Sequence, residues 1–298
     1  MKLHRSLLFV PGIRENMLEK AAGSDADIVV LDLEDSVPPA EKARARELVG
    51  QHAPRIAAAG RQVHVRVNPG PEAREDISAV LSASVGGVSL PKVEGPQDVR
   101  DFDVLLREFE LEREIRPGAT ALILWVESAQ GLLRLGESLV ASTRVAGAAL
   151  GPEDYCNDLE IRHTPGGEEL DFARNTVAVA AIGAGVIPLD GPYSDFRNDD
   201  GLRAESERVR QMGFKGRFCI HPAQIPIVNE AFSPAPEEVE LARRIVEAYD
   251  AGVRDGRGAI QLEGRMIDVP VARRARRLLA AAAALEERAG PPRKESDS

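Results

Sequence analysis

Two acidic residues, Glu127 and Asp154, each follow a short apolar run, and together they are the strongest candidates for chemistry in this chain. The runs cover residues 121–126 and 147–152. Apolar runs of this length, bounded by Gly or Pro, predict fully buried strands. A carboxylate at the end of a buried strand is costly to desolvate unless a partner compensates its charge. Two such carboxylates on successive parallel strands predict one shared divalent cation, and their oxygen ligands favour Mg²⁺ or Mn²⁺.

The elements that position these carboxylates are eight apolar segments of strand character. They cover residues 7–10, 27–33, 63–67, 87–91, 121–126, 145–150, 185–189 and 217–220. Most of the intervening segments show helical periodicity, as in residues 77–81, 99–109, 131–139 and 170–181. Alternating strands and helices predict a parallel sheet with crossover helices, and eight such units fit a (β/α)8 barrel. A doubly wound open sheet is the alternative, but no G-x-G-x-x-G motif follows the first strand.

Charged or polar residues stand near the predicted carboxyl end of every strand, where (β/α)8 enzymes build their active sites. A set of structural ion pairs that caps the barrel is the alternative interpretation. For Arg66 the two interpretations are compatible, because a guanidinium group paired with Glu34 or Asp35 can still face a substrate. Besides Glu127 and Asp154, the strand ends carry Arg14, Glu34, Asp35, Arg66, Lys92, Asp190 and His221.

The composition argues against several classes of protein. The chain has 298 residues and a formal net charge of −10, which predicts no nucleic-acid-binding surface. No apolar run approaches the length of a membrane span, and residues 1–5 lead directly into the first strand, so we expect a cytoplasmic protein without a signal peptide. The two cysteines, Cys156 and Cys219, suit a reducing compartment. Cys156 is either a catalytic thiol or, since no base is obviously paired with it, a buried filler.

The chain is predicted to divide into three parts. Residues 1–232 form the barrel, residues 233–289 a C-terminal helical extension or lid, and residues 290–298 a disordered tail. The one clear linker is predicted at residues 229–236. Two helical stretches, 237–252 and 269–288, make up the extension, and residues 258–268 between them form a short hairpin or loop.

Seven motifs, in order over about residues 5–285, resemble the citrate lyase β-subunit-like family. They cover residues 5–12, 31–37, 65–68, 90–92, 127–131, 151–154 and 219–222. This family is similar to malyl-CoA lyases, citramalyl-CoA lyases and the citryl-carrier-protein lyase subunit. The resemblance implies a (β/α)8 barrel that uses Mg²⁺ to cleave or form a carbon–carbon bond between a 2-oxo acid and an acyl thioester.

The resemblance also implies roles for the strand-end residues. Glu127 and Asp154 would bind the metal, and Arg66 would contact the reacting carbonyl groups. Glu34 and Asp35 would orient Arg66 and metal-bound water. The chemistry suits these residue types, because the hydroxyl and carboxylate of a 3-hydroxy-3-carboxyacyl thioester can chelate Mg²⁺ together. Arg66 adds a permanent charge and a fork of donors for an enolate or carboxylate oxygen.

Asp268, which is distant in sequence from the predicted barrel strands, completes the implied site. Residues 264–270 resemble the C-terminal segment that carries an aspartate into the neighbouring subunit's active site in the acyl-CoA lyase branch, and Asp268 is the matching position. The resemblance thus implies a catalytic Asp268 and a homo-oligomer, a trimer or a multiple. The local pattern alone also fits an N-cap of the last helix. Arg14 and Lys20 are candidates for CoA phosphate contacts, although Lys20 also fits a solvated helix face.

The sequence therefore predicts a Mg²⁺-dependent carbon–carbon lyase for a CoA thioester such as malyl-CoA or citramalyl-CoA. Its small-molecule partners would be the acyl-CoA and a 2-oxo acid, glyoxylate or pyruvate. Two alternatives remain open. One is the β-subunit of a multi-subunit citrate lyase that acts on a carrier-protein thioester. The other is a non-catalytic barrel that binds acyl-CoA, against which the retained Glu127, Asp154, Arg66 and Asp268 argue.

Overall fold

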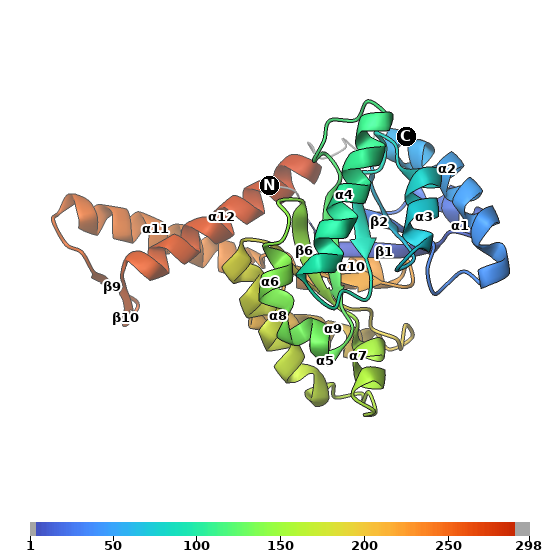
Figure 1. Ribbon diagram of the computed structural model, residues 1–298. Helices are drawn as coiled ribbons and strands as arrows, with labels where there is room; N and C mark the ends of the chain where they lie inside the picture. The colour runs from blue at the N-terminus through green and yellow to red at the C-terminus, as the bar shows by residue number, and fades with distance from the viewer. Residues whose placement is uncertain (1–3, 290–298) are drawn as a thin grey trace, which may run out of the picture. The chain divides into compact units, whose positions relative to one another are not determined.

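Eight parallel strands close into a barrel in the computed structural model, which describes residues 4–289 (Figure 1). Neighbouring strands follow one another along the chain, and the last strand pairs with the first. The predicted (β/α)8 barrel is therefore confirmed, and the open-sheet alternative is wrong because closure leaves no edge strand. The strands are β1 (Ser6–Pro11), β2 (Ile28–Asp32), β3 (Gln62–Arg66), β4 (Gly87–Leu90), β5 (Ala121–Val126), β6 (Val145–Leu150), β7 (Ile187–Asp190) and β8 (Gly216–Cys219).

Helices surround the barrel and pack their apolar faces on its outer wall. The predicted linker at 229–236 begins too early, because residues 229–231 still belong to the last barrel helix, in which Ala231 is buried. No helix within residues 4–289 combines the length and apolar character that crossing a bilayer requires. The helices are α1 (Glu15–Ala21), α2 (Lys42–Ala58), α3 (Glu72–Val80), α4 (Pro96–Glu112), α5 (Ala129–Leu133), α6 (Leu135–Leu139), α7 (Pro152–Asp158), α8 (Asp171–Ala184), α9 (Asp199–Met212) and α10 (Gln224–Ala231), with short 3-10 turns at η1 (Pro39–Glu41) and η2 (Glu168–Leu170).

The barrel interior changes from apolar to charged along the strand direction. Side chains two positions apart on a strand point to the same face. Val30 on β2 and Trp125 on β5 belong to the apolar interior cluster, so the residues two positions later, Asp32 and Glu127, lie one layer above it. Arg66 pairs with Asp32 in the β2–β3 register and joins this upper layer. The apolar layer consists of Leu7, Ile28, Val30, Ile123, Trp125, Ala149, Leu189 and Phe218.

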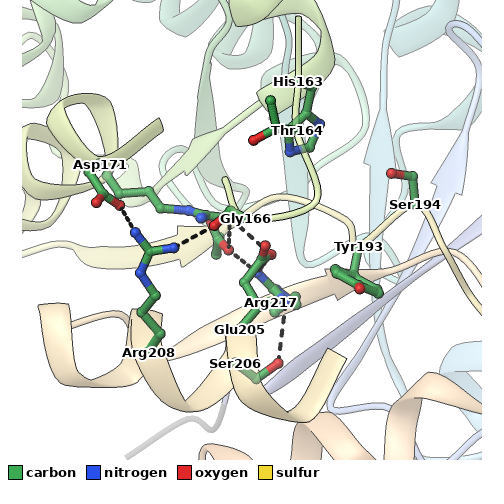
Figure 2. A network of polar contacts seen from close by, with 12 residues as sticks. His163, Thr164, Gly166, Asp171, Tyr193, Ser194, Glu205, Ser206, Arg208 and Arg217 are labelled. Carbon is green, nitrogen blue, oxygen red and sulfur yellow. Dashed lines mark hydrogen bonds and ion pairs between the residues drawn. The ribbon is translucent and has the colours of Figure 1, made fainter. Parts of the chain in front are cut away.

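A buried ion network ties β7 and β8 to α8 and α9. Arg174 donates to the two carboxylate oxygens of Asp190 at 3.2 and 3.1 Å, and Arg217 also pairs with Asp190. Arg217 pairs with Glu205 as well (Figure 2). For Asp190 the interpretation as a structural ion pair applies, because Leu189 occupies the interior position and Asp190 points to the opposite face of the strand. Burial alone would raise the pKa of Asp190, but the charges of Arg217 and Arg174 outweigh it and lower that pKa.

Residues 233–289 form a second compact unit. It contains α11 (Pro236–Arg254), α12 (Val269–Ala289) and an antiparallel hairpin of β9 (Ile260–Leu262) and β10 (Arg265–Ile267). The hairpin turn is Glu263–Gly264, with φ values of 50° and 77°, and left-handed backbone at both positions is typical of a two-residue hairpin turn. The predicted lid function of this unit stays a prediction, and the predicted tail at 290–298 lies outside the described residues.

Candidate active site

The carboxyl ends of the barrel strands surround a pocket of about 430 Å³. Four predicted site residues line it, namely Asp35, Arg66, Glu127 and Asp154. A barrel places strand ends that are distant in sequence around one opening, which explains this convergence. The other lining residues are Phe9, Pro11, Asp32, Ser36, Trp125, Gly151, Pro152, Glu153, Pro192, Ser194 and Ile220.

Three carboxylates hold Arg66. Its Nε and Nη2 donate to the two oxygens of Asp32 at 2.7 and 2.8 Å. Its Nη1 lies 2.9 Å from Glu34 Oε2 and 3.7 Å from Asp35 Oδ2. The Phe9 ring supports the guanidinium group from one side, with 4.6 Å between the guanidinium carbon and the ring centroid. The two-point contact with Asp32 fixes the plane of the guanidinium group.

Asp32 is a strand-end residue to which the sequence analysis assigned no role. The sequence analysis placed Glu34 and Asp35 beside Arg66, and the structure adds Asp32 as the partner with the best geometry. The position of Asp32 could have indicated a role, since a charged residue at the end of a buried strand needs a partner that compensates its charge. The identity of that partner follows only from the β2–β3 register.

The charges in this cluster shift one another's pKa values. Burial would raise the pKa of Asp32, but hydrogen bonds and charge from Arg66 lower it below its usual value. Burial would lower the pKa of Arg66, and the same Asp32 contacts together with Glu34 raise it instead. The pKa of Glu34 is raised, chiefly by burial and, despite Arg66, by the neighbouring charge of Asp35. Arg66 is therefore permanently charged, and Asp32 is its ionised partner.

Lys92 connects this cluster to Glu127. Its backbone N–H donates to Glu127 Oε2 at 2.6 Å, and its Nζ lies 3.1 Å from Glu34 Oε1. Lys92 has a φ of 52°, a left-handed conformation that is strained for a residue with a side chain. Burial would lower the pKa of Lys92, but the charge of Glu34 raises it. Lys92, in the loop after β4, thus contacts the carboxylates of both Glu127 and Glu34.

Glu127 and Asp154 supply oxygen ligands of the kind a hard cation prefers. Glu127 is only 5% exposed, and burial together with the charge of Glu34 raises its pKa to about 7. A buried carboxylate that is this difficult to ionise by itself suits a site where a cation compensates its charge. A Cβ atom at Gly151 would lie 2.6 Å from Glu127 Cγ and 2.9 Å from its Oε1, so only glycine leaves room for this carboxylate.

The donor set fits an open cation site rather than a closed one. No group of three or more His, Cys, Asp or Glu side chains within residues 4–289 is arranged to hold a metal ion. A cation at Glu127 and Asp154 would therefore keep coordination positions for water and for a ligand. Mg²⁺ commonly binds through one or two carboxylates and retains such positions. The residues present are compatible with this ion.

Arg14 and Lys20 do not line the pocket, and Asp268 belongs to the other compact unit. Arg14 is exposed, and its backbone N–H donates to the carbonyl of the pocket residue Pro11 at 3.0 Å. Lys20 is exposed near the end of α1 and does not line the pocket. Asp268 lies in the unit formed by residues 233–289, where its Oδ1 accepts a 3.3 Å hydrogen bond from the Val271 N–H. That bond is the N-cap contact that the local sequence pattern predicts.

Glu153, to which the sequence analysis assigned no role, forms a second polar group at the pocket. Glu153 Oε1 lies 2.8 Å from His163 Nδ1 and accepts a longer hydrogen bond of 3.4 Å from Ser194 Oγ. Figure 2 shows His163 and Ser194 on separate loops beside the network of Glu205 and Arg217. Glu153 thus joins the loops that follow β6 and β7.

The two thiols are not suited to nucleophilic chemistry. Cys156 and Cys219 are both buried. Burial raises the pKa of both thiols, and that of Cys219 reaches about 12. A neutral thiol is a poor nucleophile. The filler interpretation of Cys156 is the one that the structure favours.

Comparisons with known proteins agree with this arrangement. A family model described as HpcH/HpaI aldolase/citrate lyase matches residues 5–222. The chain is 38% identical over 281 residues to citrate lyase subunit beta of Haemophilus influenzae, which covers 94% of this chain and 97% of that protein. It is 35% identical over 269 residues to the (3S)-malyl-CoA thioesterase of Cereibacter sphaeroides, with 89% of each chain covered. The crystal structure of CitE from Mycobacterium tuberculosis in complex with magnesium, acetoacetate and coenzyme A is similar, with a TM-score of 0.76, 30% identity and coverage of 93% of this chain and 97% of that one.

Proposed function

The chain belongs to the HpcH/HpaI aldolase/citrate lyase family, and from this premise we propose that it cleaves or forms a 3-hydroxy-3-carboxyacyl-CoA such as malyl-CoA or citramalyl-CoA. It is an enzyme of the lyase type with an acyl-CoA lyase kind of activity. The products of cleavage would be acetyl-CoA and a 2-oxo acid, glyoxylate or pyruvate. The observation that carries the proposal is the convergence of Arg66, Glu127 and Asp154 on one pocket.

Glu127 and Asp154 are the proposed ligands of Mg²⁺. Support comes from their oxygen donors, the raised pKa of Glu127 and the space that Gly151 leaves for its carboxylate. The related CitE of Mycobacterium tuberculosis was crystallised with magnesium. When bound, Mg²⁺ would act as a Lewis acid that stabilises negative charge on the oxo-acid half of the substrate.

Arg66 is the proposed electrostatic catalyst. Cleavage transfers the proton of the 3-hydroxyl group to a water molecule and breaks the bond between carbons 2 and 3, which leaves the electron pair on the acetyl thioester as an enolate. Arg66 lines the pocket and is oriented in advance, so that it can donate to an enolate or carboxylate oxygen without reorganisation. Glu34 and Asp35 are proposed to orient Arg66 together with Asp32, and the contacts of 2.9 and 3.7 Å support this role.

Asp268 is the proposed proton carrier for the acetyl methyl group. In cleavage its acid form would protonate the enolate, and in condensation its carboxylate would remove a methyl proton. We propose that a second copy of the chain supplies it, which makes the active unit a homo-oligomer. Exposed apolar side chains on barrel helices support self-association. They are Leu133 on α5, Phe172, Val179 and Ile182 on α8, and Val140 just after α6.

The CoA end of the substrate is proposed to meet Arg14 and Lys20. Both are exposed cations on the segment that follows β1, and Arg14 lies three residues beyond the pocket residue Pro11. Lys and Arg are the side chains that bind phosphate groups most readily. The cytoplasmic location and the size of the oligomer stay predictions.

A product analysis tests the proposal. The purified protein is incubated with malyl-CoA or citramalyl-CoA, with Mg²⁺ or with a chelator, and acyl-CoA species and oxo acids are quantified by chromatography. We expect equal amounts of acetyl-CoA and oxo acid, in the Mg²⁺ samples only. Release of free CoA without acetyl-CoA would instead indicate hydrolysis, which the similarity to a malyl-CoA thioesterase makes the second candidate. Turnover of a carrier-protein thioester alone would favour the citrate lyase subunit function.

A further inference from the structure

Trp125 lies at the inner end of the pocket, directly below the proposed metal ligand Glu127. It lines the pocket although it is only 2% exposed. Trp125 and Glu127 stand two positions apart around the end of β5, so their side chains point to the same side, into the barrel. A molecule held at the carboxylate of Glu127 therefore has the indole ring of Trp125 next to it.

The indole ring is fixed by two other aromatic rings. Its centroid lies 4.4 Å from that of Phe218 and 5.7 Å from that of Phe9, and Phe9 stacks on Phe218 at 5.0 Å. All three rings belong to or pack against the same interior cluster. Because close-packed aromatic rings in a barrel interior have little room to move, the floor of the pocket is a rigid apolar surface.

The Trp125 indole also carries an unused donor. Nε1 is buried and has no hydrogen-bond partner among residues 4–289. Buried donors without a partner are rare, and they reduce stability. The N–H group is enclosed by protein atoms, so the surface that Trp125 presents to a ligand in the pocket is the apolar part of its ring.

The charged groups around Trp125 disfavour a substrate that carries another carboxylate besides the one on its oxo-acid half. The cations there are Arg66, which pairs with three carboxylates, and Lys92, which pairs with Glu34. Among the described residues that line or contact the pocket, both cations already have acidic partners, and the proposed function assigns Arg66 to the reacting oxygens, so neither cation is left for a further carboxylate. An additional carboxylate group would be desolvated against aromatic rings and close to carboxylates. These carboxylates are Asp32, Glu34, Asp35, Glu127, Glu153 and Asp154.

We propose that Trp125 determines substrate specificity, because its ring limits the size of the substituent on carbon 3 of the acyl-CoA. The site then accepts a hydrogen or methyl substituent, as in malyl-CoA and citramalyl-CoA, and rejects a carboxymethyl group, as in citryl-CoA. The corresponding free oxo acids are glyoxylate and pyruvate as opposed to oxaloacetate. This inference rests on the proposed lyase function.

Binding is measured first, without turnover. Trp125 is the only tryptophan of the chain, so intrinsic fluorescence reports on this site alone. Glyoxylate, pyruvate and oxaloacetate are titrated in turn into the Mg²⁺-loaded protein. We expect the emission to change with glyoxylate and pyruvate at concentrations at least tenfold below those needed for oxaloacetate. Emission that none of the bound oxo acids alters, with binding confirmed by calorimetry, would overturn the inference.

Variants then test the size of the ring. Trp125→Phe keeps an aromatic ring but a smaller one, and we expect kcat/KM for citryl-CoA to rise relative to that for malyl-CoA, by less than in Trp125→Leu. Trp125→Leu shortens the side chain, and we expect kcat/KM for citryl-CoA to rise at least tenfold relative to that for malyl-CoA. Phe214→Leu is the control, because Phe214 is equally buried but belongs to the outer core cluster. It should keep the wild-type preference.

The outcomes distinguish this inference from the function on which it rests. If the wild-type protein cleaves acyl-CoA but Trp125→Phe and Trp125→Leu keep its affinities and preference, the specificity role is wrong and the lyase function stands. If no oxo acid binds and no acyl-CoA is cleaved, the proposed function itself is wrong. Should Trp125→Leu fail to fold, as circular dichroism would reveal, the Trp125→Phe measurement still decides whether the size of the ring sets the preference.

Discussion

Asp32 and Arg66 stand opposite each other in the register of β2 and β3, and their side chains form two parallel hydrogen bonds of 2.7 and 2.8 Å. Asp32 is only 2% exposed, so this pair is shielded from competing water. The guanidinium group is thereby oriented before any substrate binds. Catalytic groups that are oriented in advance stabilise a transition state without the cost of reorganisation.

The first prediction concerns the shape of the cation at position 66. Lysine keeps the charge but loses the planar fork that matches Asp32. We expect Arg66→Lys to fold normally and to lose about 100-fold or more in kcat, as for other groups that stabilise developing charge. Arg46→Lys is the matched control, since Arg46 also pairs with two acids, Asp76 and Glu75, but lies outside the pocket. A near-native kcat for Arg66→Lys would leave Arg66 with a structural role only.

The second prediction concerns the proposed metal ligands. Asp154→Asn keeps the shape of the side chain and removes its charge. Because Mg²⁺ prefers charged oxygen ligands, we expect weaker Mg²⁺ binding by calorimetry and a loss of activity that high Mg²⁺ concentrations partly restore. Asp158→Asn serves as control, because the side chain of Asp158 accepts a hydrogen bond from Ala129 and does not line the pocket. Full activity of Asp154→Asn at low Mg²⁺ would contradict the assignment.

The third prediction follows from the pKa of Glu127, which burial raises from its ordinary value of 4.5 to about 7. Between these values the metal-free folded protein binds more protons than the unfolded chain, so its stability falls as pH rises through this window. The full penalty, on the order of 3 kcal/mol, applies above pH 7. We therefore expect Glu127→Gln to melt at a higher temperature than the wild type at pH 8 in a chelator, and at nearly the same temperature at pH 4.5.

Mg²⁺ adds a second readout to this prediction. Protons compete with the metal for Glu127, so the Mg²⁺ affinity of the wild type should fall as pH decreases below about 7. Mg²⁺ should raise the melting temperature of the wild type more at pH 8 than at pH 6, and should not stabilise Glu127→Gln comparably. Equal stabilisation of both proteins by Mg²⁺ at pH 8 would place the metal elsewhere.

The fourth prediction concerns the ion network outside the barrel. Asp190→Asn leaves Arg174 and Arg217 without one of their buried partners. Breaking a buried ion pair from one side costs about 3–5 kcal/mol, and denaturant unfolding should show a loss of this size. Asp171→Asn removes an ion pair with Arg208 that is partly exposed, for which about 0–1 kcal/mol is expected. Equal effects of the two variants would mean that the buried network contributes no more than a surface pair.

The fifth prediction tests whether Asp268 acts across subunits. Asp268→Asn should still bind Mg²⁺ and oxo acid but lose proton exchange at the acetyl-CoA methyl group. Mixing it with inactive Arg66→Ala subunits should restore part of the activity, because some interfaces would join an intact Arg66 barrel to an intact Asp268 donor. Absence of recovery, with subunit exchange verified independently, would count against donation between subunits.

The strands and the polar rim could be predicted from sequence because both leave local signals. A run such as residues 121–126 is apolar throughout, since helices and barrel interior bury both faces of a parallel strand. Glu127 stands out at its end because a charge after such a run needs compensation. The hairpin at residues 258–268 was visible in the same way, since Gly264 supplies a residue suited to left-handed backbone.

The pairings depend on contacts between segments that are distant in sequence. Asp32 lies 34 residues from Arg66, and only the register of β2 with β3 brings their side chains together. Asp190 has the same type and strand-end position as a rim residue, yet it faces the helices, because a shift of one residue along a strand reverses the side-chain direction. Local sequence patterns thus identify which charged residues stand at the strand ends. The closure and register of the sheet decide which of them meet, because those contacts form only when all eight strands pair.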